Sequence, residues 1–247
     1  MTIRDSLVLD HFYINASNED FDALLKMKDF IQNGFRHSVV KTDNDQWEGI
    51  YLRSRAGSYF EILRNRRPNS LGLAFQTFDP MSLDASEIMS ELPLDWNVFS
   101  RSFPDGQNWF DSISTMEDPA SLGNYFSPWI MKYYIRKAKP QAVIAPRSID
   151  RFPSIEMTLG RAHLEHVRSL SEWFPGVREF NADFIHFQYP DRDGWSFDVR
   201  IHLVDGDQRF EFKTAVIEMY EAFPDFKPLK LGSFVLSRSE RSLVLAR

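Results

Sequence analysis

The chain has 247 residues, enough for one large domain or two smaller ones. Its 29 basic and 35 acidic residues give a formal charge of −6, so the chain has no long-range electrostatic attraction for nucleic acid. Cysteine is absent, which excludes disulfides and thiolate chemistry. Neither a signal peptide nor a run of ~18–20 apolar residues stands out, so we expect a cytoplasmic protein that does not bind membranes.

The first residues predict a strand, a helix and three further strands, a βαβββ unit. Residues 7–14 (LVLDHFYI) favour a strand, and Asn18 can cap a helix that carries apolar side chains at helical spacing as far as Ile31. Gly34 is typical of the position after a helix end. The three strands that follow are predicted at residues 35–41, 46–53 and 58–64.

Two further segments repeat this order less clearly. The second module covers residues 71–136, and residues 137–153, with three prolines, are expected to be a linker. Residues 154–247 predict a third βαβββ-like segment with a C-terminal tail that adds edge strands. The elements expected in the second module are a strand at 71–78, a helix at 82–92 and strands at 96–103, 108–115 and 127–136. Those expected in the third segment are a strand at 154–159, a helix at 162–174, strands at 178–189, 195–203 and 208–218, and tail strands at 232–236 and 242–245.

This element order predicts an α+β fold in which repeated βαβββ units form curved mixed sheets. Together with LDHFYI (9–14) and SYFEIL (58–63), it resembles the vicinal oxygen chelate superfamily of glyoxalases, bleomycin-resistance proteins and extradiol dioxygenases. Residues 47–78 are most similar to an uncharacterised bacterial branch of glyoxalase-like proteins. The resemblance covers residues 7–136, which would form one glyoxalase-like domain of two modules (7–64 and 71–136).

The resemblance implies a cup that holds a divalent metal ion through one residue from the first and one from the last strand of each module. In the first module these positions are His11 and Glu61. In the second, the first-strand position falls on Gly72, so Gln76 is the substitute, and residues 126–134 contain no His, Glu or Asp. An imidazole and a carboxylate suit Fe, Mn, Ni, Co or Zn.

The residues around Glu61 support a functional interpretation but leave it open. A carboxylate between Phe60 and Ile62 is costly to bury alone, so it needs a metal, a cationic partner or water. Without a metal, Glu61 could serve as a catalytic base, or it could form a structural hydrogen-bonded pair with His11.

Aromatic residues are abundant, with 22 Phe, 8 Tyr and 6 Trp, so some can line the cup as well as fill the core. A wall of this kind favours a flat or ring-containing ligand. Arg53 could bind a carboxylate or phosphate of that ligand, although a solvated arginine at the rim is the simpler interpretation. The candidate wall residues are Tyr13, Trp47, Tyr51, Tyr59 and Trp129.

The other histidines are weaker candidates. His163 and His166 share one face of a predicted helix, which is usually a solvated face. His37, His186 and His202 stand in predicted strands, where a structural role is more common.

Three functions remain open on the sequence. The first is a metal-assisted lyase, isomerase or dioxygenase acting on a small oxygenated or aromatic molecule, with the metal as Lewis acid. The second is a metal-free protein that binds or sequesters an aromatic ligand. The third is a structural or interaction module with a degenerate site. A small-molecule ligand is the expected partner, and a homodimer would be in keeping with the fold.

Overall fold

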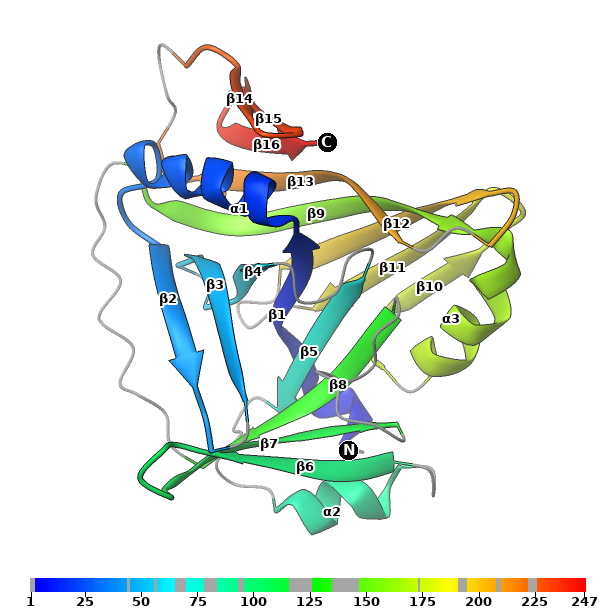
Figure 1. Cartoon of the computed structure of the whole chain (residues 1–247). Helices are drawn as coiled ribbons and strands as arrows, with labels where there is room; N and C mark the ends of the chain where they lie inside the picture. Colours follow the sequence, from blue (N-terminus) through cyan, green and yellow to red (C-terminus); the bar gives the residue numbers. More distant parts are fainter. Residues whose placement is uncertain are drawn as a thin grey trace.

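The structure is a computed structural model that describes residues 3–43, 45–55, 57–64, 70–77, 84–92, 96–115, 126–134, 147–172, 174–190, 195–207, 210–221 and 226–247. These residues form two eight-stranded sheets, and the second lies across the first (Figure 1). No helix in these ranges is long and apolar enough to cross a membrane.

The first sheet has the strand order β2-β3-β4-β1-β5-β8-β7-β6. Strand β1 is central: it pairs in parallel with β4 and antiparallel with β5, which joins the two modules. The strands are β1 (Leu7–Ala16), β2 (Phe35–Lys41), β3 (Gln46–Arg53), β4 (Tyr59–Arg64), β5 (Leu71–Thr77), β6 (Trp96–Ser102), β7 (Asn108–Thr115) and β8 (Phe126–Tyr133). The helices are α1 (Asn18–Leu24), continued by a 3-10 turn (Leu25–Asp29), and α2 (Ala85–Ser90).

The second sheet has the corresponding order, β10-β11-β12-β9-β13-β16-β15-β14. Its strands are β9 (Ile149–Gly160), β10 (Val177–Phe180), β11 (Phe184–Pro190), β12 (Ser196–Val204), β13 (Glu211–Met219), β14 (Leu229–Leu231), β15 (Phe234–Ser239) and β16 (Ser242–Ala246), and its helix is α3 (Leu164–Ser171). The predicted fold class, α+β with curved mixed sheets of βαβββ units, is therefore confirmed.

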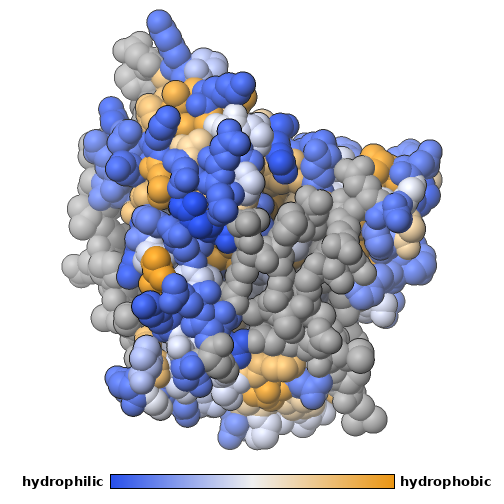
Figure 2. Space-filling view, viewed as in Figure 1, coloured by the Kyte–Doolittle hydropathy of each residue, from blue (hydrophilic) through white to orange (hydrophobic). Residues whose placement is uncertain are grey.

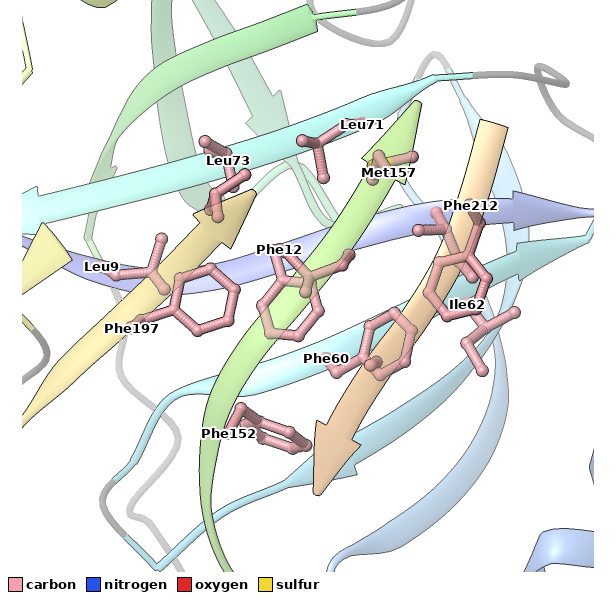
Figure 3. Packing of buried hydrophobic residues seen from close by; sticks show 14 of the residues in the cluster. Leu9, Phe12, Phe60, Ile62, Leu71, Leu73, Phe152, Met157, Phe197 and Phe212 are labelled. Atoms are coloured by element: carbon pink, nitrogen blue, oxygen red, sulfur yellow. The ribbon is translucent and has the colours of Figure 1, made fainter. Parts of the chain in front are cut away.

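One hydrophobic core joins the two sheets. Phe12 of β1 stacks on Phe60 of β4 and on Phe197 of β12, with ring centroids 4.6 Å apart in both pairs. Figure 3 shows these rings between crossing strands of the two sheets, with Phe152 beside them. Because both sheets contribute to the same buried cluster, each covers one face of the other.

A polar contact also ties the two halves together. The Asp20 carboxylate of α1 accepts hydrogen bonds from the Ser233 backbone N–H at 2.6 Å and from the Ser233 hydroxyl at 2.9 Å. Partial burial raises the pKa of Asp20, but these hydrogen bonds, the one with Ser17 and the charge of Arg247 outweigh it and hold the pKa below its ordinary value. Helix α1 is thereby attached to the turn between β14 and β15.

The first helix differs at both ends from the expectation. Its N-cap is Ser17 rather than Asn18, because the Ser17 hydroxyl accepts the Asp20 backbone N–H. Gly34 is not the C-cap; it begins the approach to β2 with a φ of 100°, and its carbonyl accepts the Arg53 N–H. A β-carbon there would lie 2.4 Å from the Arg53 carbonyl oxygen, so only glycine lets the chain pass this close to the end of β3.

Three expectations for the second half are also wrong in detail. Strand β9 begins at Ile149, inside the segment expected to be the linker, whose residues 137–146 lie outside the described ranges. The single strand expected at 178–189 is a hairpin, because the Asn181 side chain accepts the N–H groups of Asp183 and Phe184 and turns the chain. Finally, neither tail strand is an edge strand, because β16 lies between β13 and β15, and β15 lies between β16 and β14.

Candidate functional site

The first sheet encloses a cavity of about 400 Å³. Its wall comes from β1 to β4 and from β6 to β8, and most of it is aromatic or apolar. A second apolar cluster, separate from the core between the sheets, forms part of this wall; it consists of Tyr13, Leu63, Ala74, Trp129 and Met131. A cavity of this size suits a small organic molecule. In the view of Figure 2 the described outer surface is mainly hydrophilic, and its apolar areas are separate patches.

The alternation of strand side chains places the predicted site residues on one face. His11 and Tyr13 of β1 point into the cavity, as do Tyr59, Glu61 and Leu63 of β4. Because β1 and β4 are parallel, His11 lies opposite Tyr59, and Tyr13 lies opposite Glu61.

A β-bulge at Asp10 changes this alternation. Leu9 lies opposite Phe75 and His11 opposite Ala74, so Asp10 is the extra residue of β1. The bulge explains why Leu9 packs in the core while His11, two residues later, lines the cavity. It also brings the side chains of Asp10 and His11 together, with Asp10 Oδ2 and His11 Nδ1 2.8 Å apart.

Asp10 is the centre of a buried hydrogen-bond network. Its Oδ1 accepts from the Gln76 amide nitrogen, and its Oδ2 accepts from the Tyr133 hydroxyl at 2.9 Å as well as from His11. The Tyr59 hydroxyl in turn hydrogen-bonds to Tyr133. Burial raises the pKa of Tyr59 and Tyr133 well above the usual value, and the Asp10 charge adds to this, so both phenols stay neutral.

The imidazole of His11 is held between aromatic rings. The Tyr59 ring stacks on it at 4.3 Å with an interplanar angle of 15°, and the Trp129 ring meets it edge-on at 5.4 Å. His11 is only 4% exposed. Stacking on one side and Asp10 on the other fix the orientation of the imidazole in the cavity wall.

Glu61 belongs to a second chain of hydrogen bonds. The Trp47 indole N–H donates to the Tyr51 hydroxyl at 2.9 Å, and Tyr51 hydrogen-bonds to Glu61. Burial and the Glu61 charge raise the pKa of Tyr51, so this phenol also stays neutral. The structural pair of His11 with Glu61, one of the alternatives that the sequence leaves open, does not form, because His11 bonds to Asp10 instead.

Gly72, the position where the resemblance requires a metal ligand, has a packing role. It lies opposite Tyr13, and a β-carbon there would be 2.0 Å from the Tyr13 ring. Glycine leaves the space in which this ring lies over β5, next to Trp129.

The rim of the cavity is cationic. Arg36, Lys41 and Arg53 line it and are exposed, and within the described ranges none of the three forms an ion pair. The Arg53 guanidinium lies 5.9 Å from the centre of the Tyr59 ring. Together with Arg101, these three residues give the cavity lining four basic residues against the acidic Asp45 and Glu61, so the cavity favours anions although the whole chain carries a formal charge of −6.

The structure brings eight of the nine predicted site residues to the cavity. Their roles stay predictions, and the ninth, Gln76, is fully buried, is not part of the wall and donates its amide to Asp10. The eight are His11, Tyr13, Trp47, Tyr51, Arg53, Tyr59, Glu61 and Trp129. None of the other five histidines lines the cavity.

Sequence reasoning missed Asp10, Tyr133 and the cationic residues Arg36, Lys41 and Arg101. A signal for Asp10 was present, because two consecutive polar residues interrupt an apolar strand at Asp10-His11. The contribution of Tyr133 depends on the parallel pairing of β5 with β8, which the sequence does not specify.

The donor set does not fit the metal site that the resemblance implies. Among the described residues, no three His, Asp or Glu side chains lie close enough together to hold a metal ion. Of the three expected ligands only His11 and Glu61 line the cavity, and the third, Gln76, is engaged with Asp10. Two donors fall short of the three or more protein ligands typical of zinc sites.

Comparisons with known proteins give structural matches only. No family model matches the chain, and no curated protein matches it in sequence. A hypothetical protein from Staphylococcus aureus is similar in structure with a TM-score of 0.52 and 10% identity, over 90% of this chain and 94% of that one. This likeness is at the level of the fold.

Two enzymes show weaker structural likeness. One is a mutant of 4-hydroxymandelate synthase from Streptomyces coelicolor, with a TM-score of 0.41 and 13% identity over 80% of this chain and 62% of that one. The other is homoprotocatechuate 2,3-dioxygenase from Brevibacterium fuscum, with a TM-score of 0.40 and 13% identity over 83% and 63%. The chain thus spans less than two thirds of either enzyme. The strand order of the two sheets agrees with the fold that the resemblance to the vicinal oxygen chelate superfamily implied.

Proposed function

We propose that the protein binds a small, flat, ring-containing organic anion in the cavity of the first sheet. The observation that carries the proposal is the combination of an aromatic wall with a cationic rim around about 400 Å³ of space. The wall offers flat apolar surface for a ring. The rim offers Arg36, Lys41 and Arg53, whose charges would attract a carboxylate, sulfonate or phosphate.

A matched pair of dyes tests this proposal. 1-Anilinonaphthalene-8-sulfonate carries an anionic group, and N-phenyl-1-naphthylamine has the same rings without it. We expect the anionic dye to bind with a stoichiometry of one, and Arg53→Gln to weaken it about fivefold while leaving the neutral dye unchanged.

Arg200 provides the matched control, because it is an exposed arginine on β12 of the second sheet. Arg200→Gln should leave the affinity of both dyes unchanged. The proposal fails if neither dye binds, or if Arg200→Gln weakens the anionic dye as much as Arg53→Gln does.

The second candidate is a metal-assisted enzyme, which the joint presence of His11 and Glu61 in the wall favours. Elemental analysis of untagged protein tests it. About one equivalent of Fe, Mn, Ni, Co or Zn, lost in His11→Ala, would support this candidate over metal-free binding. Absence of metal, with none taken up on titration, would leave the binding protein.

A further inference from the structure

The hydrogen bonds of Asp10 determine the tautomer of His11. The carboxyl receives three donors: the amide of Gln76, the hydroxyl of Tyr133 and the imidazole of His11. An ionised carboxylate only accepts hydrogen bonds, and it has enough lone pairs for all three. In its neutral form the imidazole therefore carries its proton on Nδ1, and Nε2 is left as an acceptor.

That acceptor belongs to a side chain in the cavity wall. Among the residues that the structure describes, no hydrogen bond reaches Nε2 of His11, whose other contacts are the rings of Tyr59 and Trp129. The phenols around it do not supply a donor, since Tyr133 donates to Asp10 and Tyr59 hydrogen-bonds to Tyr133.

We infer that His11, positioned by Asp10, is the hydrogen-bond acceptor that selects ligands carrying a hydroxyl or N–H group on their ring. The inference rests on the proposed function and specifies in addition that the ring of the ligand carries a hydrogen-bond donor. A ring O–H or N–H would meet Nε2 at the buried wall, while the anionic group of the ligand lies at the rim beside Arg53. A ligand with only ether or carbonyl oxygens at the buried end would leave Nε2 without a donor and lose affinity.

Displacement of the bound anionic dye by two naphthalenes tests the selection. 2-Naphthol offers an O–H, and 2-methoxynaphthalene has the same rings with that hydrogen replaced by methyl. We expect 2-naphthol to displace the dye at a concentration about five- to tenfold lower.

Two variants assign this preference to its residues. His11→Phe keeps a ring against Tyr59 but has no acceptor, so the preference should fall to about onefold while 2-methoxynaphthalene still displaces the dye. Asp10→Asn should also reduce the preference, because it removes the carboxylate that fixes the tautomer. His186→Phe is the matched control: this histidine also bonds to an aspartate, Asp198, at 3.1 Å, but on the second sheet and outside the cavity, so the preference should not change.

The outcomes separate this inference from the proposed function. A preference that survives in His11→Phe, or that is absent in the wild type while both naphthalenes displace the dye, overturns the inference and leaves the binding function standing. Failure of both naphthalenes to displace the bound dye overturns the inference alone, whereas failure of the anionic dye itself to bind overturns the proposed function as well.

Where His11→Phe does not fold, the wild-type protein provides a second measurement. In protein labelled with ¹⁵N-histidine, the Nε2 resonance of His11 should move on addition of 2-naphthol and stay in place with 2-methoxynaphthalene. Equal movement with both compounds would contradict the inference.

Discussion

The two sheets share one strand order but differ in what covers the face that points away from the shared core. In the first sheet β1 and β5 are buried on both faces: besides the core, β1 faces the cavity, and β5 is covered by the Tyr13 ring at Gly72. In the second sheet β12 alternates between buried and accessible positions, which is typical of a sheet with one face in water. The same topology thus produces a cavity in one half and a solvated surface in the other.

The charges differ in the same way. On the second sheet, an ion pair joins Arg200 to Glu156 at 3.6 Å and a hydrogen bond joins His186 to Asp198 at 3.1 Å, so these surface groups have partners within the sheet. At the rim of the first sheet, Arg36, Lys41 and Arg53 have no such partners within the described ranges. Because the topology is the same, side chains make the difference between the two sheets.

Removing the two aspartates that bond to histidines should give the largest difference between the halves. Asp10→Ala leaves three buried donors without their acceptor and should lower the free energy of unfolding by about 3 kcal/mol. Asp198→Ala, at a site where the side chains are 22% and 24% exposed, should cost less than about 1 kcal/mol. Urea denaturation measures both, and equal losses would show that the Asp10 network is not the more strongly buried one.

A substitution that fills the space under Tyr13 should have the next largest effect. Gly72→Ala puts a β-carbon where the Tyr13 ring lies, and we expect a loss of about 2 kcal/mol in unfolding free energy and at least a tenfold weaker binding of the anionic dye. Adding Tyr13→Leu should restore most of the stability, because it removes the ring that clashes. If Gly72→Ala alone retains wild-type stability and dye affinity, this account of Gly72 is wrong.

The contact between the halves should contribute less and should depend on pH. Because hydrogen bonds lower the pKa of Asp20 in the folded protein, its stabilisation is present above the ordinary aspartate range and is lost as the pH falls through the folded pKa. Asp20→Asn should therefore cost about 1 kcal/mol at pH 7, and this difference should begin to shrink below about pH 4 and vanish only below the folded pKa. Thermal unfolding of both proteins across this pH range checks the sign; a difference that grows on acidification would refute it.

The sequence predicts the first sheet better than the second. Residues 7–64 consist of strand-like runs and one helical run between clear turns, and β2 and β3 begin and end where expected. The hairpin at Asn181 was missed because its turn depends on a side-chain hydrogen bond within a continuous strand-like run. The interior position of β16 was missed because strand order depends on long-range pairing, which local patterns do not encode.

The same limit applies to the site. His11 and Glu61 could be placed on the cavity face from the two-residue period of their strands. The partner of His11 could not, because the bulge at Asp10 breaks that period, and Tyr133 reaches Asp10 from a distance of 123 residues along the chain. The resemblance to a metal-binding fold predicted Gln76 as a metal ligand. In the structure its amide instead donates a hydrogen bond to Asp10, the carboxylate that holds His11.

Mapping the bound dye onto the backbone tests the central claim, that the first sheet and not the second is the binding face. In amide NMR spectra of the protein titrated with 1-anilinonaphthalene-8-sulfonate, we predict saturable shifts for amides of β1, β3, β4 and β8, around Tyr13, Tyr51, Tyr59 and Trp129, and none for β9, β12 and β13. Shifts centred on the second sheet, or spread equally over both sheets, would contradict the account.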